Sequence, residues 1–157
     1  MASKSLAIRA TGFKPLLPLL RGRIIDLRPA GNAMIQHLRF GGTGSIEDHF
    51  LSQRYYTPRG GYAAWRPSKR AIREGNLTLV DTGAYRAAWL GQGVGSRTSR
   101  ERDRVRVGVD QVRFPQVNVF QGDRIVRGNA PRRIGIGPTI VRGIRDIMLR
   151  YFATGKV

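Results

Sequence analysis

The C-terminal stretch 138-PTIVRGIRDIMLRYF-152 decides the fold more than any other part of the chain. Its apolar residues recur at the spacing of one helical face. They are Ile140, Val141, Ile144, Ile147, Met148, Tyr151 and Phe152. Arg142, Arg145 and Arg150 fall on the other face, and Pro138 suits the first turn of a helix. The pattern predicts a long C-terminal amphipathic helix of about 16 residues, roughly 24 Å in length.

A second stretch, 104-RVRVGV-109, predicts a β-strand, because its valines alternate with Arg104, Arg106 and Gly108 at a period of two. Further extended segments are expected at 112–120, where Pro115 weakens the first half, at 124–127 and at 132–137. Together with the helix, these strands predict an α+β fold, a small and mainly antiparallel sheet packed by helices.

Shorter helices are expected before this sheet. Apolar periodicity predicts one over 30–39. Ser45 resembles an N-cap with Asp48 three positions later, which predicts a second helix to about residue 54. A helical turn is expected at 71–74, and a helix at 84–90 with Asp81 or Thr82 as its N-cap.

The remaining segments lack periodicity. Residues 1–30 are predicted to form an extended arm or edge segment, with a strand at 23–27, since three prolines interrupt them. Residues 55–70 are expected to be a loop with aromatic anchors, and 91–104 a mobile basic loop. We therefore divide the chain into an N-terminal arm with a short helix (1–44) and an α+β domain (45–157).

The composition is strongly basic. The 157 residues include 28 Lys+Arg and 10 Asp+Glu, for a formal net charge of +18 and a pI near 11.7. Only four of the basic residues are lysines, which leaves 24 arginines. This charge predicts an acidic partner, either nucleic acid or an anionic protein surface. Arginine is also enriched at protein–protein interfaces.

Other classes of protein are disfavoured by the sequence. The chain has no cysteine, which excludes disulfides and thiolate metal sites. No apolar run approaches the ~20 residues that span a bilayer, and the N-terminus matches no signal peptide, so we expect no membrane association.

Candidate catalytic residues are few. His37 and His49 are the two histidines, and the adjacent Glu47 and Asp48 suit a first helical turn. The glycines of 91-GQGVG-95 follow a predicted helix rather than a strand, unlike a phosphate-binding loop. We expect a protein that is not an enzyme and that uses neither a cofactor nor a metal.

The sharpest basic feature is the set Arg97, Arg100, Arg102 and Arg104, called here the hairpin arginines. They could contact phosphates or a neighbouring subunit, and the interleaved Glu101 and Asp103 favour the subunit contact. A second mixture, of aromatic and basic residues in 54–70, resembles a single-strand binding surface. Aromatic residues in such a loop more often anchor it to a core.

An ordered set of short motifs runs from residue 50 onward. It comprises 50-FLSQR-54, 61-GYAAWRP-67, 79-LVDTGAYR-86, 105-VRVG-108, 120-FQG-122, 130-APRR-133 and the helix from Pro138. In this order they resemble the tail-completion, or virion morphogenesis, proteins of Mu-like and related long-tailed phages. The signature residues carried by the resemblance are Trp65, Pro67, Asp81, Thr82, Gly83, Gly108, Gln121 and Gly122.

The resemblance implies a structural virion protein of the head–tail junction, assembled in the host cytoplasm. Such proteins form homo-oligomeric rings, commonly hexamers, that join the tail tube to the head connector. Neighbouring connector, stopper and tail tube proteins would be the partners, and the hairpin arginines could face packaged DNA. Two alternatives remain open: a head-completion (stopper) ring, and a non-specific basic nucleic-acid-binding protein.

Overall fold

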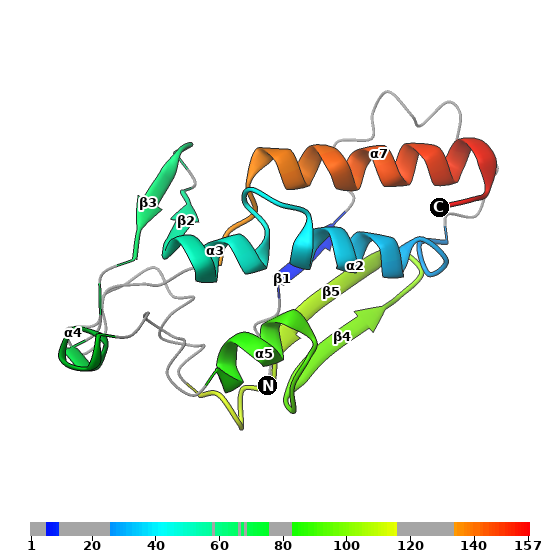
Figure 1. Ribbon diagram of the computed structural model, residues 1–157. Coiled ribbons are helices and arrows are strands. Elements are labelled where there is room, and N and C mark those ends of the chain that lie inside the picture. The colour runs from blue at the N-terminus through cyan, green and yellow to red at the C-terminus, as the bar shows by residue number, and fades with distance from the viewer. Residues whose placement is uncertain are drawn as a thin grey trace.

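The computed structural model describes residues 6–9, 26–57, 59–65, 67, 69–75, 83–115 and 134–157. Within these residues the chain forms five helices and two small antiparallel sheets (Figure 1). The predicted α+β class, with a helix at the C-terminus, is confirmed.

The larger sheet has the strand order β1-β5-β4, from β1 (Leu6–Arg9), β5 (Arg104–Val109) and β4 (Ser96–Arg100). Both pairings are antiparallel, and Val107 of β5 stands opposite Leu6 on one side and Thr98 on the other. The valines of β5 are buried at 0–2% exposure, as their alternation predicted. The strand lies at the centre of the sheet because it is the one with a fully apolar face.

The prediction of a mobile basic loop over 91–104 is wrong for its second half. Residues 96–100 form strand β4, and 101–103 are the connection to β5. The sequence of this strand shows no alternation of apolar and polar residues, because its half-exposed positions carry arginine, serine and other polar side chains. Pairing with the apolar β5 supplies the stabilisation that its own composition does not.

The N-terminal arm contributes an edge strand, as the edge-segment interpretation expected, since Leu6–Arg9 pairs with β5. Of the strand predicted at 23–27, residues 23–25 lie outside the described part. Leu27 lies in irregular backbone but is buried, and its N–H donates to the carbonyl of Arg102 at 2.8 Å.

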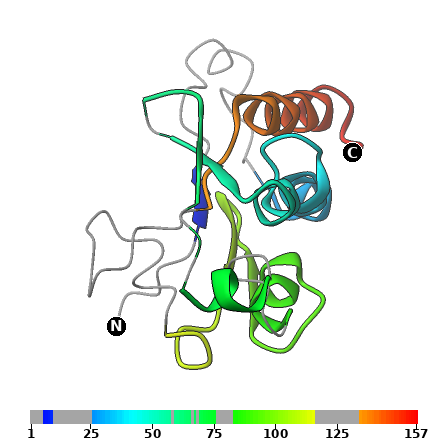
Figure 2. The same cartoon turned by 60° about the vertical axis from the view of Figure 1, so that its left-hand side comes forward.

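Helices α2 (Gly31–Phe40), α5 (Ala84–Leu90) and α7 (Pro138–Thr154) lie on the same side of this sheet (Figure 2). Helix α2 packs between the sheet and α7, so α7 is the outermost layer (Figure 1). Ile140, Ile144 and Met148 of α7 are buried, whereas Val141 is 55% exposed. The predicted apolar face of α7 is wider than the stripe that α2 covers.

Helix α3 (Ile46–Ser52) begins as predicted, with the Asp48 N–H donating to Ser45 Oγ at 3.2 Å. It stops two residues earlier than expected, because Gln53 adopts the left-handed conformation at φ 53°. The loop expected over 55–70 is wrong for residues 55–56 and 62–64, which lie in a hairpin of β2 (Arg54–Tyr56) and β3 (Tyr62–Ala64).

Two predicted features around the short helices need correction. Helix α4 spans Lys69–Glu74, slightly longer than the expected turn. The N-cap of α5 is Gly83, in the left-handed conformation at φ 72°, not Asp81 or Thr82.

The strand expected from residue 112 is a turn at 111–113, followed by buried Phe114. The extended segments predicted at 116–120 and 124–127 lie outside the described residues. Of the segment predicted at 132–137, residues 134–137 are described and form no strand.

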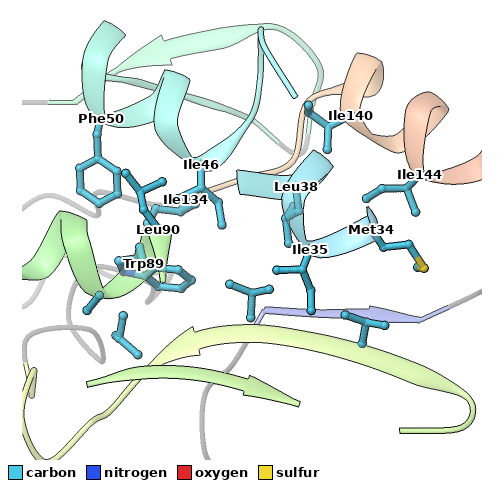
Figure 3. Packing of buried hydrophobic residues seen from close by; sticks show 14 of the residues in the cluster. Met34, Ile35, Leu38, Ile46, Phe50, Trp89, Leu90, Ile134, Ile140 and Ile144 are labelled. Atoms are coloured by element: carbon cyan, nitrogen blue, oxygen red, sulfur yellow. The ribbon is translucent and has the colours of Figure 1, made fainter. Parts of the chain in front are cut away.

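One hydrophobic core joins these elements (Figure 3). Met34, Ile35 and Leu38 of α2 lie between the sheet and Ile140 and Ile144 of α7. At the other end, Phe50 packs edge-to-face against Trp65, with ring centroids 5.6 Å apart. The core therefore fixes α7 on one side of α2 and the β4–β5 hairpin on the other.

Candidate interaction surface

The hairpin arginines lie on strand β4 and around its connection to β5, and most of them face a partner within the chain. Arg97 forms an ion pair with Asp110, directly after β5. Arg104 contacts Glu101 and Asp103, each at 3.2 Å. Arg100 donates to the side-chain oxygen of Asn32 on α2. Three of the four predicted residues are therefore engaged within the protein.

The pKa values of two carboxylates of the hairpin, Asp103 and Asp110, are lowered in the folded protein. The Arg104 guanidinium lowers the pKa of Asp103. The pKa of Asp110 is lowered first by the Val112 backbone N–H and then by Arg97. Both acids remain ionised at neutral pH, so Arg97 and Arg104 are neutralised locally. Arg102 is exposed at the connection, where its backbone carbonyl accepts from Leu27.

The outer face of the sheet is polar. Arg97, Ser99 and Arg106 lie on the side of the strands opposite the buried valines, since paired residues share a face. Helices α2 and α5 pack against the other face, with α7 behind α2 (Figure 2). Arg106 approaches Glu101 at 3.7 Å, so this face too carries internally matched charge.

A buried arginine anchors the hairpin, and sequence reasoning missed it. Arg39 of α2 is 7% exposed and donates through Nε to the Trp89 carbonyl at 3.2 Å. Its Nη2 donates to Ser96 Oγ at 3.3 Å and to Thr98 Oγ1 at 2.9 Å. Burial lowers its pKa. The signal was present, because Arg39 follows Ile35 by four residues and so lies on the apolar face of α2.

The guanidinium of Arg39 ties together three elements. Its contact with Trp89 lies at the C-terminal end of α5, where unpaired carbonyls favour a cation. Gly91 adopts φ 76° beside this group, and a Cβ there would overlap the guanidinium. Gly91 therefore leaves space for the guanidinium of Arg39.

Helix α7 presents a second basic surface, the α7 arginine face, made of Arg142, Arg145 and Arg150. All three are exposed, and Asp146 is the single acid of this helix. Asp146 lies 3.9 Å from Arg145, with both side chains more than half exposed. Within the described residues, Arg142 and Arg150 contact no carboxylate.

The aromatic residues of 54–65 divide into two groups. Trp65 is 4% exposed in the core and Tyr55 packs against it, so these two anchor the hairpin. Tyr56 and Tyr62 stack edge-to-face at 5.3 Å, and the Arg54 guanidinium lies 4.5 Å from the Tyr62 ring centre. The rings are thus satisfied by each other and by Arg54, and they offer no open stacking platform.

The remaining signature residues are dispersed in the structure. Pro67 is exposed, Gly83 starts α5, and Gly108 is buried in β5 opposite Arg97. Asp81, Thr82, Gln121 and Gly122 lie outside the described residues. The described members form no single pocket and act as structural positions.

The two histidines have packing roles. His49 is fully buried, and its Nε2 donates to the Gly135 carbonyl at 2.6 Å, which fixes the Nε2-H tautomer. Burial lowers the pKa of His49. His37 of α2 lies against Gly143 of α7, where a Cβ would overlap its ring.

Among the described residues, no group of three or more His, Cys, Asp or Glu side chains is arranged to hold a metal ion. No helix in the same part of the chain has the length and apolar character to cross a membrane. Comparison with protein-family models, with curated proteins and with solved structures found no match to this chain.

Proposed function

We propose that this chain is a structural subunit of the head–tail junction of a long-tailed phage, and that its copies assemble into a hexameric ring that joins the tail tube to the head connector. The ordered series of short motifs from residue 50 to the C-terminal helix carries the proposal. Several of these motifs coincide with element boundaries, including the end of α3, the residue after β3 and the start of α5.

The open edge of β4 supports head-to-tail assembly. The Glu101 N–H bonds the Arg104 carbonyl and the Asp110 N–H bonds the Gly95 carbonyl. By the two-residue period, the backbone groups of Thr98 and Arg100 point away from β5. Within the part of the chain that the structure describes, no further strand pairs with this edge, and an edge of this kind can accept a strand from a neighbour.

Rings form through heterologous contacts, in which one surface of a subunit meets a different surface of the next and the rotation closes. The β4 edge is our candidate for one side of such a contact.

The first experiment measures assembly. Mass photometry and negative-stain electron microscopy of the purified protein should show a closed ring, and particles assembled without the protein should show unjoined heads and tails. A monomer at all concentrations, with intact virions in its absence, would refute the proposal. Heads that leak DNA without the protein, while tails remain complete, would assign the stopper position instead.

A second experiment tests the β4 edge. Thr98→Pro removes the outward N–H and the hydroxyl that Arg39 contacts, whereas Thr98→Val removes the hydroxyl alone. Rings should be lost in Thr98→Pro and kept in Thr98→Val. Equal assembly by the two variants would exclude this edge as a subunit contact.

A further inference from the structure

The α7 arginine face has the clearest unmatched charge among the described residues. Arg142, Arg145 and Arg150 are exposed on α7, and helical spacing places them on the side opposite the buried stripe of this helix. They span eight positions, about 12 Å along the helix axis. One carboxylate, Asp146, accompanies them.

The β4–β5 hairpin provides the internal contrast. Residues 96–110 contain five arginines and three carboxylates, and the carboxylates contact Arg97, Arg104 and Arg106. An arginine already paired with a carboxylate must break that pair before it can bind another anion. Arg142 and Arg150 have no such pair to break, so the binding free energy of an external anion is more favourable on α7 than on the hairpin.

The composition of the α7 arginine face indicates the class of anion. Val141, at 55% exposure, is its one exposed large apolar residue. Leu149, four residues after Arg145 on the same side of the helix, is partly exposed. Protein–protein interfaces usually centre on larger clusters of aromatic or aliphatic anchors than these two residues provide. Protein–DNA interfaces are more polar and much more positively charged.

The geometry of duplex DNA also suits cations that are spread over one exposed side of a helix, as these three are. B-DNA carries one negative charge per ~1.7 Å of axis, so a basic helix face meets several phosphates in any register. Arginine forks pair well with phosphate oxygens. An acidic protein would need carboxylates at matching fixed positions.

We propose that the α7 arginine face is a docking surface for the phosphate backbone of duplex DNA, bound without regard to base sequence. The inference rests on the charges of α7 and does not require ring assembly. It places the DNA contact on α7 and not on the hairpin arginines, for which the sequence left a DNA contact as one possibility beside a subunit contact. In a ring, the same face would meet DNA passing through the junction.

The test is a salt titration of binding to a labelled random-sequence duplex of 30 base pairs, followed by fluorescence anisotropy. The variant R142Q/R145Q/R150Q should bind at least tenfold more weakly near 100 mM salt. The slope of log K against log[salt] should become shallower by about 2.7, from 0.9 per lost phosphate contact. The variant R142K/R145K/R150K should keep the wild-type slope, because the charges remain.

A matched control removes the same charge from the hairpin. R97Q/R100Q/R104Q lowers the net charge by three as well, and its slope should change by less than one, with circular dichroism confirming that it is folded. Equal losses in the two glutamine variants would overturn the proposal, since net charge alone would then explain binding. Binding of polyglutamate but not DNA by the wild type would also overturn it, in favour of an acidic protein partner. Mass photometry of each variant separates these outcomes from a failure of ring assembly.

Discussion

The β4–β5 hairpin and helix α7 are both rich in arginine, yet they use it in opposite ways. In the hairpin, Asp110 and Glu101 contact Arg97 and Arg104. On α7, Arg142 and Arg150 face solvent with no carboxylate partner in the described part of the chain. The difference shows that a count of basic residues does not locate an anion-binding surface, because neighbouring acids decide which charges are free.

The largest expected effect concerns the arginine that anchors the hairpin. Arg39→Ala should reduce the free energy of unfolding by about 3 kcal/mol, because it leaves the Trp89 carbonyl and two hydroxyls without their donor and opens a cavity. Urea denaturation measures the change. Arg142→Ala should alter stability by no more than about 0.5 kcal/mol. Similar costs for the two substitutions would break the distinction between anchoring and free arginines.

The attachment of α7 to α2 gives the next largest effect. Gly143→Ala should destabilise the protein by about 1–2 kcal/mol, because its Cβ would overlap the His37 ring. The intrinsic helix preference for alanine offsets part of this cost.

A double-mutant cycle sharpens that test. In a His37→Ala background, Gly143→Ala should become neutral or stabilising, because the ring that it strikes is gone. Thermal melts of the four proteins give the coupling energy. If Gly143→Ala costs the same in both backgrounds, His37 is not what makes glycine necessary at the α2–α7 crossing.

A smaller effect depends on pH and acts on the segment that leads into α7. Burial lowers the pKa of His49, so the folded state resists a proton that the unfolded state accepts near pH 6.5. Stability should be full above this pH and should decline as pH falls below it, by at most about 1.4 kcal/mol per pH unit. Melting temperatures between pH 7.5 and 5 measure the decline. His49→Gln should flatten this component, and an unchanged profile would assign the decline to other groups.

The smallest effect on stability is expected when acids of the hairpin are removed, which leaves its arginines without carboxylate partners, as on α7. Glu101→Gln with Asp103→Asn removes two exposed acids, and because exposed ion pairs contribute little to stability, urea denaturation should show almost no change. The freed arginines should then steepen the salt dependence of duplex binding by about one to two. The DNA titration described above measures this slope. No gain in binding would mean that the acids do not limit the hairpin's contact with phosphate.

The sequence predicted the elements whose periodicity and burial agree. Val105, Val107 and Val109 alternate and are buried, and Ile140, Ile144 and Met148 line the inner stripe of α7. The Ser45 cap also followed from local chemistry. These features depend on residues a few positions apart, which is the range that sequence patterns report.

Features that depend on distant partners could not be predicted in this way. Strand β4 is polar and owes its conformation to β5, and hairpin β2–β3 lacks an alternating pattern. The pairing of Arg97 with Asp110, and the freedom of Arg142, become visible once the strands and helices are placed. The choice between a phosphate-binding and a self-paired arginine is a tertiary property.

The register of β1 has a consequence for synthesis of the chain. Leu6 pairs with Val107, a partner about 100 residues downstream, whereas β4 and β5 are joined by a three-residue connection. At translation rates of about 5–20 residues per second, the first strand waits roughly 5–20 s for its partner to leave the ribosome. Strand β1 therefore has no β5 to pair with during this interval, whereas β4 and β5 emerge together and can pair at once.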